Sequence, residues 1–158
     1  DGDYKAFLLR HAPELKQPGN IVLPNGEILG RHEGLAFYTV GQRKGLGIAW
    51  KEPLYVQALD QEKNQVIVGP QEGLFAKKLL TSSAYFVEGT PPIGQAIPVE
   101  AKIRYAAVAA PAHLTLRDDG KMEIEFETPQ RAITPGQSVV CYQGEYVIAG
   151  GPIEKAIQ

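Results

Sequence analysis

The second half of this 158-residue chain is a succession of short β-prone runs separated by turn residues. In one run, from Val99 to Tyr105, apolar and charged side chains alternate. Successive side chains of a strand point to opposite faces, so we expect Val99 and Tyr105 to share a buried face and Arg104 to be solvated. The runs expected to form strands are 82–87, 96–105, 112–117, 122–126, 137–142 and 146–149. Short strands joined by turns in this way predict a small closed barrel.

The first half is expected to fold as a second β-rich unit built on hairpins. Asn25 and Gly26 lie between two β-prone runs, and this pair supplies the positive φ that a tight hairpin turn needs. A polar stretch at 60–64 separates two further β-prone runs and predicts another hairpin. Apolar residues at helical spacing in 4–8 predict a short helix that ends near Pro13.

The stretch at 69–73, Gly-Pro-Gln-Glu-Gly, is typical of a junction between two compact units because it is rich in turn residues. We therefore expect one β-rich domain over 1–72 and a β-barrel domain over 73–158. The predicted fold class is mainly β, with two small domains.

The composition excludes several classes of protein. With 16 Lys and Arg residues against 18 Asp and Glu residues, the formal net charge is −2, which argues against binding nucleic acid by bulk positive charge alone. A local phosphate site remains compatible with this charge. The uncharged stretches are too short to span a bilayer, so no membrane association is expected. The N-terminus has no basic leader followed by an apolar core, and we expect a cytoplasmic protein.

The single cysteine and the three histidines do not suggest a reactive site. Cys141 lies in an apolar run, where a buried and unreactive thiol is the expected outcome. One cysteine also excludes an internal disulfide. His11, His32 and His113 are far apart in the sequence and lack the spacing of metal ligands, so no metal site is predicted.

The segment Gly41-Gln42-Arg43-Lys44-Gly45 combines two glycines, an amide and two adjacent cations. Glycine backbone and cationic side chains of this kind can surround an anion. The segment lacks the residue order of a Walker loop and of a dinucleotide fingerprint. Its pattern is as compatible with a solvated glycine-rich turn as with an anion site, and both interpretations stay open at this point.

Two weaker signals lie in the second half. Arg104 and Tyr105 end a predicted strand, where the arginine could contact a phosphate and the tyrosine could stack on a base. A solubilising surface pair is equally compatible. Gln137 follows a segment at 134–136 that has the composition of a β-turn. Taken one at a time, these features support only a β-rich two-domain binding protein without a self-sufficient catalytic constellation.

The motifs are more informative when they are considered together and in order. They are Asp3-Tyr4-x-x-Phe7-Leu8, Gly30-x-His32-x-Gly34-Leu35-x-x-Tyr38-Thr39-x-Gly41-Gln42-Arg43-Lys44-Gly45-Leu46-Gly47-Ile48, Pro53-Leu54-Tyr55-Val56, Lys102-Ile103-Arg104-Tyr105, Pro129-Gln130, Thr134-Pro135-Gly136-Gln137, Tyr142-x-Gly144-Glu145 and Gly150-Gly151-x-Ile153. This set strongly resembles the C-terminal half of the bacterial tRNA-specific 2-thiouridylases, and the resemblance covers nearly the whole chain.

The resemblance implies a fold and an activity. Residues 1–72 would form a central domain, a β-roll or SH3-like unit with a short N-terminal helix, and 73–158 a barrel similar to those of translation factors. The parent enzyme would catalyse ATP-dependent 2-thiolation of the tRNA wobble uridine, with sulfur from the persulfide relay of a sulfur-carrier protein. The family's ATP-binding loop and both catalytic cysteines lie ahead of the first matching motif. We therefore expect a fragment that is inactive alone and holds no cofactor.

The resemblance also assigns roles to the weak local signals. The family's tRNA contacts correspond to Arg104, Tyr105 and Gln137. The segment 41–45 would form the surface nearest the catalytic centre, unless its glycines serve an interdomain turn. The predicted function is binding and positioning of tRNA. An independent β-barrel module for RNA or protein is the alternative, and a complete small enzyme is disfavoured because the nucleophile and the phosphate loop are missing.

Overall fold

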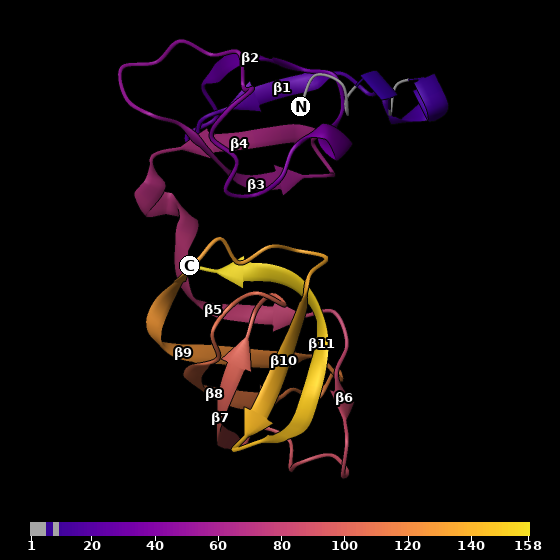
Figure 1. Cartoon of the computed structure of the whole chain (residues 1–158), viewed down its shortest axis with the longest axis vertical. Helices are drawn as coiled ribbons and strands as arrows, with labels where there is room; N and C mark the ends of the chain where they lie inside the picture. Colours follow the sequence, from indigo (N-terminus) through magenta and orange to yellow (C-terminus); the bar gives the residue numbers. More distant parts are fainter. Residues whose placement is uncertain (1–5, 8–9) are drawn as a thin grey trace. The chain divides into compact units, whose positions relative to one another are not determined.

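The computed structural model describes residues 6–7 and 10–158, which form two compact units. The first unit ends at Leu74, and the second unit is Phe75–Gln158 (Figure 1). The stretch at 69–73 that was expected to join them leads into a 3-10 helix, η3 (Gln71–Leu74). The chain enters the first strand of the second unit directly after this helix.

The first unit contains a four-stranded sheet with the strand order β2-β1-β4-β3. Its strands are β1 (Gly19–Val22), β2 (Ile28–His32), β3 (Tyr55–Asp60) and β4 (Gln65–Gly69). The pairs β1–β2 and β3–β4 are antiparallel, which confirms both predicted hairpins. The two hairpins are joined by a parallel pairing of β1 with β4, which no local pattern predicted.

Turn chemistry explains the first hairpin. Gly26 has a φ of 93°, and its N–H donates to the Leu23 carbonyl at 2.9 Å. Asn25 accepts a hydrogen bond from the Glu27 N–H through its side-chain oxygen at 2.9 Å. A left-handed backbone is cheap at glycine, which has no Cβ, so this pair closes the turn as predicted.

A side-chain contact helps to join the hairpins into one sheet. Asn64, in the turn between β3 and β4, donates through Nδ2 to the carbonyls of Gln17 and Pro18 at 3.1 and 3.0 Å. The buried His32 ring bonds through Nε2 to the Asn64 carbonyl at 2.8 Å. A Cβ added at Gly19 would collide with that carbonyl oxygen. The start of β1 is therefore held against the turn that precedes β4.

The core of the first unit includes residues from outside the sheet. Ile21, Val56, Val66 and Val68 from the strands are joined by Leu46 and Leu54, both of which lie in the long connection between β2 and β3. Burial of apolar surface stabilises by roughly 25 cal/mol per Å². These two leucines therefore attach the connection to the sheet.

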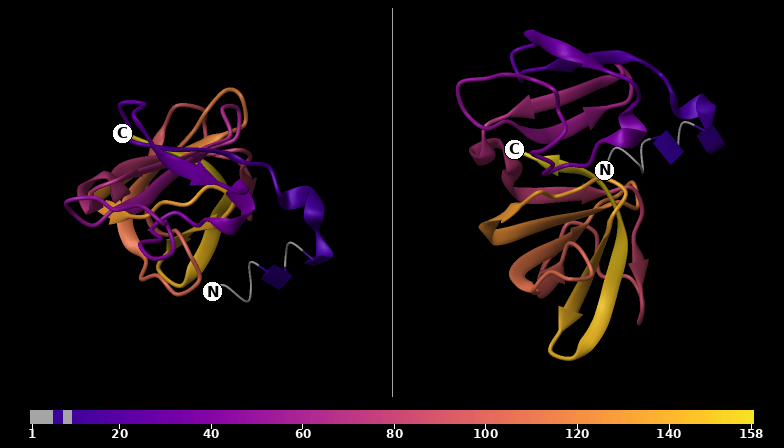
Figure 2. Two further views of the ribbon diagram at one scale, coloured as in Figure 1. Left: turned by 90° about the horizontal axis from the view of Figure 1, so that it is seen from above. Right: turned by 45° about the horizontal axis from the view of Figure 1, so that its top comes forward.

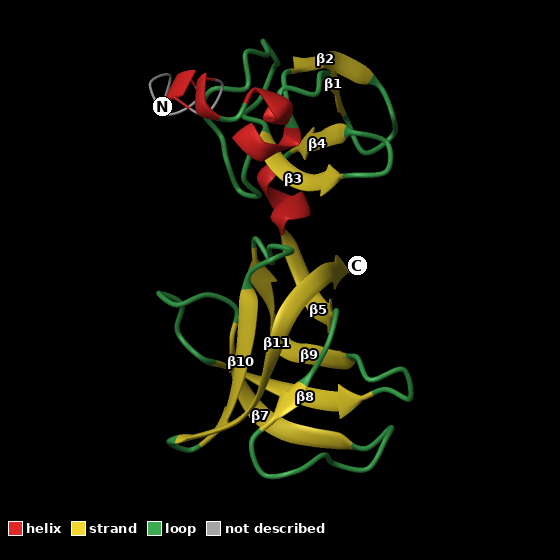
Figure 3. Cartoon of the chain, turned by 90° about the vertical axis from the view of Figure 1, so that its right-hand side faces the viewer, coloured by secondary structure: helices red, strands yellow, loops and turns green. Residues whose placement is uncertain are grey.

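The helical part of the chain is small and belongs to the first unit, as the red segments of Figure 3 show. Of the predicted N-terminal helix, Phe7 and Arg10 are helical, whereas Tyr4 and Leu8 lie outside the described residues. Two further 3-10 helices are η1 (Pro13–Leu15) and η2 (Leu35–Phe37). Within residues 6–7 and 10–158, no helix has the length and apolar character that crossing a membrane requires.

The second unit is a closed six-stranded barrel, as predicted. Its strands follow the order β10-β7-β8-β9-β5-β11, and a further pairing between β10 and β11 closes the ring. Figure 2 shows the β10–β11 hairpin in orange and yellow. The short strand β6 (Tyr85–Phe86) pairs with β11 outside the ring. The barrel strands are β5 (Phe75–Thr81), β7 (Ala96–Lys102), β8 (Ala110–Leu116), β9 (Met122–Arg131), β10 (Ser138–Gln143) and β11 (Tyr146–Ile157).

Two sequence expectations about these strands are wrong. The strand expected at 82–87 is reduced to β6, and β5 takes its place in the barrel. Sequence reasoning missed β5 because Lys77 and Lys78 interrupt its apolar pattern at an irregularity of register. Tyr105 is not on the buried face, because β7 ends at Lys102 and a bend follows. The side chain of Tyr105 is 96% exposed.

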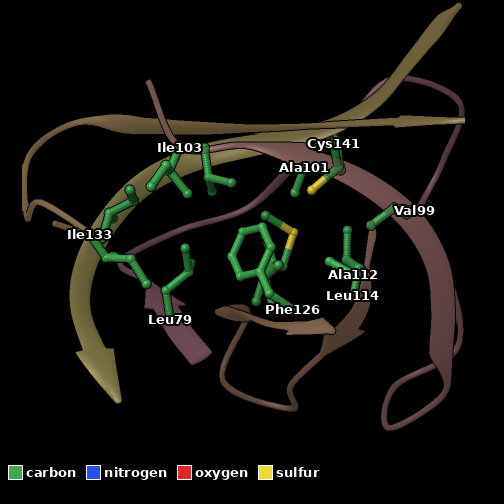
Figure 4. Close-up of a cluster of buried hydrophobic side chains, with 14 of the residues drawn as sticks. Leu79, Val99, Ala101, Ile103, Ala112, Leu114, Phe126, Ile133 and Cys141 are labelled. Atoms are coloured by element: carbon green, nitrogen blue, oxygen red, sulfur yellow. The ribbon is translucent and has the colours of Figure 1, made fainter. Parts of the chain in front are cut away.

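The barrel interior is filled by apolar side chains from every strand of the ring. Phe126, Leu114, Leu79 and Val139 are among its fully buried members, and most of the cluster is drawn in Figure 4. Cys141 lies in the same cluster, which confirms that this thiol is buried. Loss of hydration on burial raises the pKa of Cys141 to about 12. The thiol therefore stays protonated near neutral pH.

Candidate nucleic-acid interface

Arg104 lies just beyond the end of β7 and reaches the connection between β9 and β10. Strand β7 pairs with β10 so that Lys102 lies opposite Val140, which brings the continuation of β7 alongside the start of β10. The Arg104 guanidinium donates through Nη2 to the Arg131 carbonyl at 2.7 Å and through Nη1 to the Ala132 carbonyl at 3.3 Å. Arg104 therefore holds the connection that carries Gln137.

The connection itself is held in a defined conformation. Ala132 has a φ of 58°, which is uncommon for a residue with a side chain, and its carbonyl also accepts a bond from Thr134 Oγ1 at 2.8 Å. The predicted turn is confirmed, because Gln137 N–H donates to the Thr134 carbonyl at 3.2 Å and Gly136 has a φ of 89°.

Gln137 combines a fixed backbone with an exposed side chain. Its carbonyl accepts a hydrogen bond from the Ile153 N–H at 2.7 Å, which ties it to β11. Its side chain is exposed to solvent, as is that of Tyr105. We call Arg104, Tyr105 and the connection 132–137 the barrel rim. The structure thus gathers the three predicted tRNA contacts of the second unit at one end of the barrel.

Two other cations of the barrel, Arg117 and Lys121, are paired with carboxylates. Because β7 and β8 are antiparallel, Arg117, which follows β8, lies at the end opposite Arg104. Arg117 contacts Asp119 at 3.1 Å and Glu123 at 3.5 Å, and Lys121 contacts Glu154 at 2.7 Å. The Arg104 guanidinium instead donates to two neutral carbonyls, and these bonds do not offset its positive charge.

In the first unit, the segment Gly41–Gly47, which we call the glycine loop, is organised by Gln42. The Thr39 N–H donates to Gln42 Oε1 at 3.0 Å, and Gln42 Nε2 donates to the Lys44 carbonyl at 2.9 Å. The backbone of the loop also pairs with β3, since Gly41 N–H donates to the Val56 carbonyl and Val56 N–H donates to the Gln42 carbonyl, both at 2.8 Å. The loop is therefore a fixed structure.

The cations of the glycine loop project from this fixed backbone. Arg43 and Lys44 are exposed. Gly41, Gly45 and Gly47 have φ values of 94°, 78° and 68°, a region that favours glycine. The segment is therefore a glycine-rich turn with two exposed cations, and this geometry is compatible with both interpretations.

Sequence reasoning missed several residues of these two surfaces. Thr134, expected only to form a turn, also donates to the Ala132 carbonyl, and the Arg131 carbonyl next to the barrel rim accepts a bond from Arg104. Trp50 and Lys51 line a hollow beside the glycine loop. An exposed tryptophan so near a glycine-rich, cationic segment was the available signal. Among the residues that the structure describes, no group of three histidine, cysteine or acidic side chains could hold a metal ion.

Comparison with known families defines the class of protein. Residues 5–70 match the family described as the tRNA methyl transferase PRC-barrel domain, and residues 76–153 match the aminomethyltransferase β-barrel domain. The chain is therefore a two-domain β protein in which a PRC-barrel domain precedes an aminomethyltransferase-type barrel.

Comparison with individual relatives identifies the family. The chain is 52% identical over 151 residues to the tRNA-specific 2-thiouridylase MnmA of Magnetococcus marinus, with 96% of this chain and 42% of the relative covered. It is 46% identical to the protein of the same name from Heliobacterium modesticaldum, with 97% of this chain and 40% of the relative covered. The chain belongs to the tRNA-specific 2-thiouridylase family and spans about two fifths of the length of these relatives.

Proposed function

We propose that this chain is the tRNA-holding part of a tRNA-uridine 2-sulfurtransferase that thiolates the wobble uridine in an ATP-dependent reaction. Family membership and the names of the relatives support this proposal. The parent protein would act in the cytoplasm and receive sulfur from the persulfide relay of a sulfur-carrier protein. ATP would bind to a part of the parent protein outside this sequence.

The burial of Cys141 supports the proposal that this chain holds the tRNA and that another part of the parent protein transfers the sulfur. A persulfide relay needs a cysteine that is accessible and readily forms a thiolate. Cys141 is the chain's single cysteine, it is buried in the barrel core, and its pKa is raised to about 12. It therefore cannot serve as the sulfur-transferring nucleophile, and the residues of this chain would bind and position the RNA.

The barrel rim would contact the RNA backbone and an adjacent base or sugar. Two of the five N–H donors of Arg104 are used on carbonyls, and the others remain available for a phosphate. Tyr105 offers an exposed ring that can pack on a sugar or base, and the Gln137 amide can donate or accept hydrogen bonds. The Arg104 bonds that hold the Gln137 connection are the observation that carries this proposal.

The glycine loop would face the region of the RNA that contains the target uridine. Its support is the fixed Gln42 framework, which leaves the Arg43 and Lys44 side chains exposed and free to contact phosphates. Phosphate contacts position an RNA without reading its sequence. This role fits a surface that places a tRNA for chemistry performed by another part of the protein.

Binding of the chain to an unmodified tRNA anticodon-arm transcript across a salt series tests the proposal. We expect salt-dependent binding that Arg104→Ala and Gln137→Ala weaken. Only Arg104→Ala removes a charge, so it alone can lower the salt slope, by up to about one. Arg117→Ala, at the opposite end of the barrel, is the matched control and should leave affinity almost unchanged. Absence of binding at low salt, or equal affinity in all three variants, contradicts the proposed role.

A thiolation assay with ATP and a sulfur donor gives a second test. We expect no turnover by the chain alone, because its only thiol is buried. A thiol-reactive dye should label Cys141 after unfolding and leave the folded chain unlabelled. Any turnover by this chain alone, or fast labelling of its folded state, would show that Cys141 is accessible and would reverse the proposal.

A further inference from the structure

A hollow of about 490 Å³ lies beside the glycine loop, within the segment that connects β2 and β3. Arg43, Gly45 and Gly47 contribute to one part of its wall, and Trp50 and Lys51 to another. Trp50 is the single tryptophan of the chain, and its side chain is 38% exposed. An aromatic ring, two cations and open glycine backbone therefore surround one space.

We propose that this hollow, which we call the Trp50 hollow, binds one unpaired nucleotide of RNA. The base would stack on the Trp50 indole, and its phosphate would contact Arg43 and Lys51. Stacking of a base on an aromatic side chain contributes about 1–3 kcal/mol and tolerates any base, because every base has a π face. The inference deepens the proposed function and rests on it, since it assigns part of the RNA to the first unit.

The glycine backbone gives a ligand close access to the hollow. A Cβ added at Gly47 would meet no atom within 4 Å, and one added at Gly45 would meet only the Gln42 amide nitrogen, at 3.8 Å. Lack of space for a side chain is therefore not the reason why glycine occupies these two positions. They adopt positive φ and leave open space where side chains would otherwise stand.

The hollow is also fixed before any ligand binds. Gln42 bonds to Thr39, ahead of the glycine loop, and to Lys44 within it, and Leu46 and Leu54 anchor the connecting segment in the core. A site that is already ordered avoids much of the entropy cost of binding.

The charge of the hollow suits a single phosphate. Arg43 and Lys51 contribute two positive charges, and Glu52, which also lines the hollow, contributes one negative charge. The remaining single positive charge matches one phosphodiester, and the carboxylate of Glu52 disfavours a second phosphate at close range. A nucleotide within an RNA strand therefore fits better than a free nucleoside di- or triphosphate.

Fluorescence excited selectively at tryptophan, and not at the seven tyrosines, tests this inference directly, because Trp50 is the single tryptophan of the chain. The 158-residue chain is titrated with a uridine tetraribonucleotide, with uridine triphosphate and with the anticodon-arm transcript. We expect saturable quenching by the tetraribonucleotide and the transcript, and much weaker quenching by the triphosphate, because Glu52 disfavours its adjacent phosphates. Equally strong quenching by the triphosphate would assign the hollow to a free nucleotide and overturn the assignment to RNA.

Variants separate stacking from charge. Trp50→Leu should lower affinity for labelled tetraribonucleotide about tenfold, which corresponds to about 1.4 kcal/mol of lost stacking. Trp50→Phe keeps an aromatic ring and should retain most of the affinity. Arg43→Gln and Lys51→Gln should each lower the salt slope by about one, whereas Lys63→Gln, in the exposed β3–β4 turn, should not change it.

Failure of the inference is distinguishable from failure of the proposed function. If the transcript binds and Arg104→Ala weakens it, but Trp50 fluorescence and Trp50→Leu affinity are unchanged, the Trp50 hollow is not an RNA site and the proposed function stands. If neither RNA binds at low salt and neither quenches Trp50, both are wrong.

Discussion

The glycine loop and the barrel rim are both exposed segments held by internal hydrogen bonds. They differ in whether a charged or a neutral side chain makes those bonds. In the glycine loop, the neutral Gln42 forms the internal hydrogen bonds, and the cations Arg43 and Lys44 project into solvent. In the barrel rim, the cation Arg104 forms the internal hydrogen bonds, and the neutral Tyr105 and Gln137 project into solvent.

Because the exposed side chains are cationic in the glycine loop and neutral in the barrel rim, the two surfaces would bind RNA by different interactions. Free cations bind phosphates and release counterions, so the contribution of the glycine loop should depend strongly on salt. Neutral side chains on a fixed backbone bind through packing and hydrogen bonds, so the contribution of Tyr105 and Gln137 should depend little on salt. Loss of the organising residue should harm either surface more than loss of an exposed one.

Arg104→Lys should have the largest effect, because lysine keeps the charge but cannot bond to both the Arg131 and Ala132 carbonyls with a planar fork. Hydrogen bonds to charged groups contribute about 1.5–3 kcal/mol, so we expect at least about a tenfold loss of tRNA affinity. The salt slope should change little, and amide exchange in 132–137 should accelerate. Full affinity in Arg104→Lys would mean that Arg104 acts only as a charge.

Gln42→Ala should produce the next largest effect. It removes the acceptor for the Thr39 N–H and the donor to the Lys44 carbonyl, and each bond contributes about 0.5–1.5 kcal/mol. We expect faster amide exchange in the glycine loop by about tenfold, measured by nuclear magnetic resonance. Gln61→Ala, an exposed glutamine in the β3–β4 turn, is the matched control. Unchanged exchange at Thr39 and Gly41 would show that backbone bonds alone hold the loop.

Thr134→Val should have a smaller effect than either. Valine preserves the shape of the side chain but removes the bond from Oγ1 to the Ala132 carbonyl, which still accepts a bond from Arg104. We expect a loss of about 1 kcal/mol in the local stability of the connection and a loss of tRNA affinity below about tenfold. Thr134→Ser retains the hydroxyl and should restore both. If serine fails to restore them, packing of the methyl group matters more than the hydrogen bond.

Lys44→Gln should have the smallest effect and the most specific signature. Its carbonyl serves the Gln42 framework, but its exposed side chain does not take part in those bonds. We expect an unchanged fold, a modest loss of tRNA affinity at low salt and a salt slope lower by about one. A slope equal to that of the original chain would remove Lys44 from the RNA-contacting surface.

The parts of the fold that could be predicted depend on local chemistry. The Asn25-Gly26 hairpin followed from glycine's freedom to adopt positive φ, and the turn at 134–137 followed from Pro and Gly at suitable positions. The burial of Cys141 followed from its apolar neighbours. These predictions succeeded because neighbouring residues suffice to determine a turn or the buried face of a strand.

The predictions that failed concern the ends and partners of strands. Alternation placed Tyr105 on the buried face, but Ile103 occupies the last core position and the chain then bends away. Strand β5 was missed because the adjacent Lys77 and Lys78 interrupt the alternation of apolar and polar residues. They lie where the pairing of β5 with β9 changes register, which the sequence of β5 alone does not show. An alternating pattern cannot show where a neighbouring strand stops.

From the order of residues alone it was possible to derive two β-rich halves, their hairpin turns, the family resemblance and the residue types able to contact RNA. The tertiary structure was needed for the parallel pairing of β1 with β4, the pairings of β10 with β7 and of β11 with β5 that complete the barrel, and the bonds from Arg104 to carbonyls more than 25 residues away. Turns depend on interactions between neighbours in the chain, whereas these contacts join segments that meet only when the core is packed.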